Sequence, residues 1–260
     1  FYELVADKKY KRRVEKLVQR ILDHIVDNDF QMIDLDGKPT RWGVWNPDSL
    51  NNSIGWGNER GLNSLQILAF LKSGYYITKD EKFEEACQDL IQNHNYAENM
   101  VQQKMYGPFE MNFVDNQLSF LPYYIISRYS DDELLRPYIQ ESIERTWKIV
   151  GHDQIAMWNI ISSITLEKDC NLDVAIDGLQ SIPMDMVDWT MENSHRWDLQ
   201  QDFLGDRRGK KQATRPIPLA ERGITKWNLN VYQLDLGRDG KNENDGAYFL
   251  LGYWMGRYHG

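Results

Sequence analysis

The chain has 260 residues, of which 42% are hydrophobic, and a formal net charge of −9, so it is long enough to fold around a substantial core. The acidic balance argues against a nucleic-acid partner, because phosphate backbones select for basic patches. The sequence contains no run of about 18 uncharged apolar residues, so we expect no membrane span. Two cysteines without metal-ligand spacing predict neither a disulfide nor a metal site.

The first 58 residues predict a helix followed by a hairpin. Apolar residues recur at helical spacing over residues 7–28, with charged residues between them. Residues 30–45 read as a β-hairpin, because the strong turn dipeptide Asp36-Gly37 separates two short apolar runs. Residues 46–58 are rich in Asn, Gly, Pro and Ser and predict a loop.

A couplet recurs over residues 59–182, and it consists of an apolar helix, a short polar turn and a charged amphipathic helix. The copies span about 62–91, 117–150 and, more weakly, 155–182. The turns that begin at Thr78 and Ser130 read [ST]-x-x-E, which predicts a capping box at the start of the second helix. Repeated helical hairpins indicate a stacked or closed helical array.

The last third of the chain is less regular. Residues 183–244 lack a clean period and predict a long irregular insertion, which is usually functional or mobile. Residues 246–258 are apolar on every side, so we expect a helix that is buried all round.

The elements together predict a single all-α domain over residues 1–260. Apolar helices with amphipathic mates favour an α/α toroid of about four helical hairpins, in a closed or incomplete ring, with a small β-hairpin and the insertion. A plain helical solenoid or an irregular bundle is the alternative.

Acidic residues stand just before the predicted inner helices, which begin at one mouth of such a ring. Our candidate catalytic residues are Glu59, Asp115 and Asp245, with Glu243 in reserve. Two carboxylates across a cleft can cleave a glycosidic bond, because one donates a proton to the leaving oxygen and the other activates water. Helix capping explains each of these residues individually, since acidic side chains are favoured at helix N-termini.

Aromatic and polar residues near the same junctions and loops suggest sugar binding. Indole faces stack on sugar rings, and an arginine can hold the carboxylate of a uronic acid. A cation–π contact that pins the hairpin is the alternative for Arg41, and a loop packed by tryptophans is the alternative for His195. The expected substrate-binding residues are Arg41, Trp45, Trp56, Arg60, Asn112, Trp158, His195 and Trp197.

The segments Asn58-Glu59-Arg60-Gly61-Leu62-Asn63-Ser64-Leu65 and Tyr75-Tyr76-Ile77-Thr78-Lys79-Asp80-Glu81-Lys82-Phe83 resemble junctions of the six-hairpin glycosidase-like toroids. This superfamily includes glucanases, unsaturated glucuronyl hydrolases and toroidal domains of polysaccharide lyases. The resemblance covers residues 59–182 and 246–258, with about four hairpins rather than six and without a complete catalytic motif. It implies a carbohydrate-active protein of a glycan-degrading bacterium, located in the periplasm or outside the cell.

The leading prediction is a glycoside hydrolase that acts on a poly- or oligosaccharide without a cofactor or a metal. A polysaccharide lyase would use a neutral base and a group that neutralises a carboxylate, for which His195, Tyr248 and Arg41 or Arg60 are candidates. A non-catalytic glycan-binding protein and a helical protein-interaction scaffold are further alternatives, the latter with a Trp-rich face as its hot spot.

Overall fold

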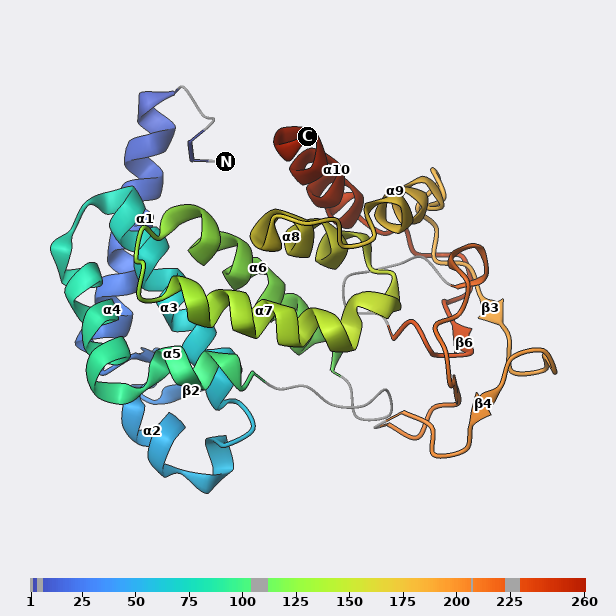
Figure 1. Cartoon of the computed structure of the whole chain (residues 1–260), viewed down its shortest axis with the longest axis horizontal. Helices are drawn as coiled ribbons and strands as arrows, with labels where there is room; N and C mark the ends of the chain where they lie inside the picture. Colours follow the sequence, from blue (N-terminus) through green and yellow to red (C-terminus); the bar gives the residue numbers. More distant parts are fainter. Residues whose placement is uncertain (1, 4–6, 104–111, 207, 223–229) are drawn as a thin grey trace. The chain divides into compact units, whose positions relative to one another are not determined.

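The computed structural model describes residues 2–3, 7–103, 112–206, 208–222 and 230–260 (Figure 1). It is mostly helical, with 58% helix, ten α-helices and a few short antiparallel strands in the described ranges, which confirms the all-α class. The chain divides into two compact units. Unit 1 comprises Phe1–Lys104 and Leu121–Ser142, and unit 2 comprises Met105–Phe120 and Ile143–Gly260.

Unit 1 is organised around one apolar helix. This helix, α3, packs against α1, α4 and α5, and its Leu65, Ile67 and Leu68 are fully buried. The absence of a polar face on α3 is therefore explained by neighbours on several sides. The elements of the first 101 residues are α1 (Lys8–Asp27), β1 (Gln31–Ile33), β2 (Pro39–Val44), α2 (Pro47–Asn52), η1 (Ile54–Trp56), α3 (Arg60–Thr78), α4 (Glu81–His94) and α5 (Tyr96–Val101).

The predicted hairpin is confirmed. Strands β1 and β2 pair antiparallel, with Gln31 opposite Val44 and Ile33 opposite Pro39, and the register shifts between these two pairs. Gly37 adopts a positive φ of 78° at the turn, a conformation that glycine reaches without the steric cost of a Cβ.

The next two helices are α6 (Phe113–Tyr129) and α7 (Arg136–Val150). Their residues within Leu121–Ser142 belong to unit 1. There the hydroxyl groups of Tyr123 and Ser142 lie 2.8 Å apart, and the Ser142 hydroxyl also donates to the carbonyl of Met100 at 2.7 Å. This buried chain satisfies polar groups that would otherwise be costly inside a core.

Unit 2 has a small helical core and a loop-rich region. Trp158 of α8 is fully buried and stacks on Phe113 and Phe120, with ring centroids 6.0 and 5.1 Å away. Strands β3 and β6 pair antiparallel, as do β4 and β5. The elements are η2 (Gly151–Asp153), α8 (Ala156–Leu166), α9 (Leu172–Gln180), β3 (Met191–Glu192), β4 (Gln201–Asp202), β5 (Gln212–Ala213), η3 (Leu219–Glu221), β6 (Asp235–Leu236) and α10 (Ala247–His259).

The predicted capping boxes are wrong in detail. Asp80, not Thr78, caps α4, because its carboxylate accepts from the amide of Lys82 at 3.1 Å. Thr78 is the last residue of α3 and donates its hydroxyl to Gly74. At the second turn, Asp132 accepts from the Leu134 amide, and α7 begins only at Arg136. Thr78 does not cap α4 because it is still part of α3, whereas Asp80 has the extended backbone conformation of an N-cap.

The expectation that the last helix is buried all round is also wrong. Helix α10 buries Tyr248, Gly252 and Met255, and it packs against α8 and α9. Leu250 and Trp254 are 50% and 62% exposed. Apolar composition alone therefore does not show how many neighbours a helix has.

Within the described residues, no helix combines the length and apolar character needed to cross a bilayer. The same residues contain no group of three or more His, Cys, Asp or Glu side chains placed to hold a metal ion.

Candidate functional site

A chain of hydrogen bonds in unit 2 leads from an exposed imidazole to a buried carboxyl group. The Tyr232 hydroxyl donates to Oδ1 of Asp153 at 2.5 Å, and Nε2 of His152 lies 2.8 Å from the same hydroxyl. The His152 side chain is 58% exposed, whereas the Asp153 side chain is fully buried. While Asp153 is ionised, it accepts the single proton of the Tyr232 hydroxyl, so Nε2 of His152 donates to the hydroxyl oxygen.

Local backbone geometry places His152 and Asp153 where α7 ends. They lie in the short helix η2, directly after Gly151. A Cβ on Gly151 would lie 2.7 Å from the Trp147 ring, so only glycine fits this close approach. Gln154 then adopts the left-handed conformation, with φ of 58°, which ends the helical path.

Tyr232 lies 79 positions after Asp153 in the sequence of unit 2. Its carbonyl accepts from the Ala213 amide at 2.7 Å, and the amide of Ile217 donates to the carbonyl of Val231 at 2.9 Å. Ala213, Ile217 and Leu234 form a buried apolar cluster with Leu199 packed against it. Backbone pairing and this small core thus hold the Tyr232 phenol against Asp153.

Arg222 fixes the loop that carries Asp153. Its guanidinium donates to the carbonyls of Ile217 and Asp153, at 2.9 and 3.2 Å, and to the side-chain oxygen of Gln154 at 2.8 Å. Arg222 is only 7% exposed. A buried cation bonded mainly to neutral oxygens is unusual, because guanidinium groups normally pair with carboxylates when they are buried.

Burial shifts the pKa values of Asp153, Arg222 and Tyr232, because their hydrogen bonds and charge interactions offset only part of the cost of burying a charge. Burial raises the pKa of Asp153 to about 7, against the opposing effects of the Tyr232 hydrogen bond and the Arg222 charge. Burial also lowers the pKa of Arg222 to about 10 and raises that of Tyr232. Oδ2 of Asp153 has no hydrogen-bond partner among the described residues. Perturbed groups of this kind are typical of functional sites, although structural networks also produce them.

The loop of residues 193–198 contacts Glu221, the residue before Arg222. Arg196 forms ion pairs with Asp198 and with Glu221, and the buried Asn193 donates to the carbonyl of Glu221 at 3.0 Å. Glu221 directly precedes Arg222, so the chain itself connects the residue that holds this loop with the residue that contacts the Asp153 backbone. Trp197, next to Arg196, is 94% exposed.

The three predicted catalytic carboxylates are divided between the two units. Glu59 precedes α3 in unit 1, whereas Asp115, in the first turn of α6, and Asp245 belong to unit 2. The Asp245 carboxylate accepts from the amide of Ala247 at 3.0 Å, as the capping alternative predicts. Pairing of these carboxylates across a cleft stays a prediction.

Two predicted sugar-binding tryptophans are core residues. Trp45 is 7% exposed and donates its indole N–H to Gln66, and its ring meets Phe70 edge-on. The fully buried Trp158 donates to Gln117 at 3.0 Å. Neither indole offers a face to a ligand in this structure, so the assignment of these two residues to a sugar-binding surface is not supported.

The two predicted arginines have structural contacts. Arg41 lies over the Trp42 ring, 4.7 Å from its centroid, which is the cation–π contact given as the alternative. Arg60 donates to the carbonyls of Leu50 and Asn51, at 2.6 and 3.4 Å, and so ties α2 to the start of α3.

The remaining predicted ligand-binding residues have varied surroundings. Trp56 and Asn112 are half-buried, in η1 and just before α6, whereas His195 and Trp197 are exposed in one loop. Tyr248, a candidate base for a lyase, is buried, and burial raises its pKa to about 12.

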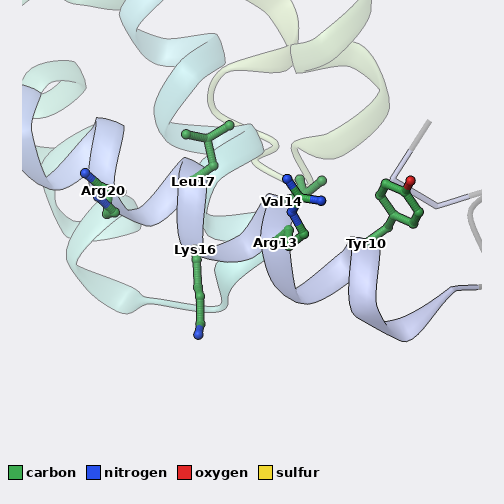
Figure 2. A pocket seen from close by; sticks show the side chains of 6 residues that line it. All are labelled: Tyr10, Arg13, Val14, Lys16, Leu17 and Arg20. Carbon is green, nitrogen blue, oxygen red and sulfur yellow. The ribbon is translucent and has the colours of Figure 1, made fainter.

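A hollow of about 470 Å³ follows α1. Figure 2 shows its lining side chains Tyr10, Arg13, Val14, Lys16, Leu17 and Arg20. All of them come from one helix, and Lys16 and Leu17 point to opposite sides. They do not converge on a common point, so this hollow lacks the arrangement of a catalytic site.

Sequence reasoning missed Asp153, Tyr232 and Arg222. The available signal was the His152-Asp153 pair at a helix end, but Asp153 and Tyr232 are 79 positions apart. Comparisons of the chain with protein-family models, with curated proteins and with solved structures find no match. The function is therefore argued from the geometry.

Proposed function

We propose that this chain is a carbohydrate-active enzyme that cleaves glycosidic bonds, and that His152 is its proton-transfer group. The single observation that carries the proposal is the chain of hydrogen bonds from His152 through Tyr232 to Asp153. A nucleophile or base whose partner is itself oriented by a third group is a recurring catalytic arrangement. The helical hairpins at 59–182 favour an incomplete α/α toroid as the scaffold, in keeping with the resemblance of its junctions.

The tautomer of His152 follows from its partner. With Asp153 ionised, Nε2 carries the proton that is donated to Tyr232, so a neutral ring has its lone pair on Nδ1. The side chain is more than half exposed, so Nδ1 can accept a proton from a substrate or from water. Tyr232 and Asp153 are positioning residues, and ionised Asp153 stabilises the imidazolium that forms, its Oδ1 being 3.6 Å from Nε2.

The exposed loop beside the cluster supplies a surface suited to sugar. Trp197 offers an almost uncovered indole, and aromatic faces combine an apolar surface with a polar edge. The ion pairs of Arg196 hold the backbone next to it. A ring stacked there would lie beside Arg196 and Asp198, whose charged groups can bind sugar hydroxyl groups.

Hydrolysis and elimination differ in what His152 deprotonates. In hydrolysis, it takes a proton from the water that attacks the anomeric carbon, and a second acidic group, for which Asp115 and Asp245 are the candidates in unit 2, gives a proton to the leaving oxygen. In elimination, it takes a proton from the carbon beside a uronic-acid carboxylate, a carbon–carbon double bond forms as the bond to the leaving oxygen breaks, and the leaving oxygen takes a proton from water. Elimination is the second candidate, because an imidazole at the end of the relay can act as its base.

The test is turnover on a panel of neutral and uronic-acid oligosaccharides, read by new reducing ends and by the ultraviolet absorbance of unsaturated products. We expect turnover in the wild type, and a loss of about 100-fold or more in kcat for His152→Ala. His94→Ala, which removes a histidine from unit 1, is the matched control and should be unaffected.

Each outcome bears on the proposal. Reducing ends without absorbance support hydrolysis, and absorbance supports elimination. Trp197→Ala should raise KM with little change in kcat, because it removes a binding surface only. Full activity of His152→Ala, or no product from any glycan with a folded protein, would contradict the proposal, and stabilisation by a glycan without product would indicate a binding protein.

A further inference from the structure

A separate cavity of about 560 Å³ lies wholly within unit 1, which is within the usual range for small-molecule pockets. The C-terminal end of α3 supplies Tyr75 and Tyr76, and the end of α6 supplies Tyr129. The turn after α6 supplies further polar side chains. Tyr76 and Tyr129 have ring centroids 4.6 Å apart, so the cavity has an aromatic wall.

The base of this cavity is a network of one buried lysine and two carboxylates. Lys72 is 4% exposed, and its ammonium donates to Glu84 at 2.6 Å and to Asp132 at 3.2 Å. The side-chain amide of Gln88 donates to the same two carboxylates at 2.9 and 2.7 Å. Two carboxylates share one ammonium here, so a negative charge is left over in a partly buried place.

The rim adds to that negative charge. Asp131 and Glu133 line the cavity and are exposed. The charged side chains of the lining are two lysines and four carboxylates, a formal charge of −2. An anionic ligand would be repelled, whereas a cation would be attracted.

The ammonium group of Lys79 shows how a cation can contact the tyrosine rings of this cavity. Nζ of Lys79 lies 4.8 Å from the centroid of the Tyr76 ring and 5.7 Å from that of Tyr75. Carboxylates hold the tyrosine hydroxyl groups, Glu3 accepting from Tyr76 at 2.6 Å and from Tyr129 at 3.2 Å. Contact with a carboxylate oxygen makes a phenol ring richer in electrons, which strengthens its attraction for a cation.

We propose that this cavity binds an organic dication of the alkyldiamine class. One ammonium takes the place of the Lys79 ammonium on the Tyr75 and Tyr76 rings. The other pairs with Asp131 and Glu133, while the alkyl stem lies against the aromatic wall. This site is independent of the glycan-cleaving function proposed for unit 2.

The test is calorimetric titration of the whole chain with 1,4-diaminobutane at low ionic strength and again in 0.5 M NaCl. We expect saturable binding that weakens in salt, because the attraction is largely electrostatic. Asp131→Asn combined with Glu133→Gln should weaken binding by up to about tenfold. Asp173→Asn combined with Asp177→Asn, which changes the net charge equally on the exposed side of α9, is the matched control.

A second variant makes a prediction of opposite sign. Lys79→Met removes the internal ammonium that competes for the tyrosine rings, so diamine affinity should rise by about threefold or more. These side chains are exposed, so all variants should fold. Absence of binding up to millimolar diamine, equal affinity in the rim variant, or unchanged or weaker affinity in Lys79→Met would overturn the proposal.

Discussion

Both units bury ionisable groups, but the pKa shifts of these groups have opposite origins. Charge pairing determines the shifts in unit 1, whereas burial determines them in unit 2. In unit 1, Lys72 contacts two carboxylates. Burial alone would lower the pKa of Lys72, but interactions with Cys87, Glu84 and Asp132 outweigh it and the pKa is raised. Burial alone would raise the pKa of Asp132, but the Gln88 hydrogen bond and Lys72 outweigh it and the pKa is lowered. In unit 2, burial of Asp153 is not outweighed, and its pKa rises to about 7.

The difference shows what each arrangement can do. A paired network keeps its charges at neutral pH, so it can stabilise unit 1 and attract a charged ligand without exchanging protons. A buried carboxyl group with one unsatisfied oxygen is near the midpoint of its titration at neutral pH, where acid–base groups work best. Proton transfer is therefore expected in unit 2 and ligand charge recognition in unit 1.

The largest expected effect comes from breaking the paired network. Lys72→Met leaves Glu84 and Asp132 without their cation, so unfolding of unit 1 should become easier by about 3–5 kcal/mol. This change in the free energy of unfolding would be measured by hydrogen exchange of the α3 amides as a function of urea concentration. The control Lys16→Met removes an exposed lysine of α1 and should change the free energy by less than about 0.5 kcal/mol.

The same variant has a pH signature. Asp132 has a lowered pKa in the folded state, so its stabilisation is present above its unfolded pKa and is lost as pH falls through the folded value. The difference between wild type and Lys72→Met should therefore narrow in acid. An unfolding free energy within about 1 kcal/mol of wild type at neutral pH would show that the pairing contributes little.

The next largest effect is the pH dependence of unit 2. The folded pKa of Asp153 is above the unfolded value, so between about pH 4 and pH 7 the folded state holds a proton that the unfolded state lacks. Stability should fall as pH rises through this window, by up to about 1.4 kcal/mol per pH unit. Asp153→Asn, of the same shape but without titration, should remove this slope in hydrogen exchange of α8 amides.

An intermediate effect is expected at the centre of the relay. Tyr232→Phe removes the hydroxyl donor and leaves Oδ1 of Asp153 as a second unsatisfied oxygen, which should cost about 1–3 kcal/mol. Because the Tyr232 hydrogen bond lowers the pKa of Asp153, the variant should also raise that pKa further. Unchanged stability together with an unchanged pKa would show that the hydrogen bond is not formed in solution.

The smallest effect concerns the cap of α4. Asp80→Ala should cost about 1 kcal/mol, because Asp80 accepts from the Lys82 amide and from Gln19. Glu81→Ala is the control, since the capping box predicted from sequence would give Glu81 the larger role. If urea unfolding ranks the two variants the other way round, the capping geometry described for α4 is incorrect.

Local sequence patterns predicted local structure well. The Asp36-Gly37 turn predicted the hairpin, and the couplets predicted the pairs α3 with α4 and α6 with α7. These predictions succeeded because periodicity and turn chemistry act over a few residues. The burial of α10 was wrong because Leu250 and Trp254 are as apolar as core residues while lacking neighbours. The toroid stays a prediction.

The sites depended on contacts that no local pattern encodes. Tyr232 reaches Asp153 across 79 positions, through backbone pairing of Ala213 with Tyr232. The turns at Thr78 and Ser130 were found, but their convergence on one cavity requires Lys72 to join Glu84 to Asp132. Such meetings are set by packing over long sequence separations, which a single sequence does not reveal.

The contrast between the two buried carboxyl groups is tested most directly by carboxyl-carbon NMR titration of the wild-type chain, with Asp153→Asn and Asp132→Asn to assign the signals. We predict that Asp153 titrates at about pH 7 and that Asp132 titrates below the ordinary aspartate range. Titration of Asp153 at or below about 4, like an ordinary exposed aspartate, would contradict the account of unit 2 as the place where protons are exchanged.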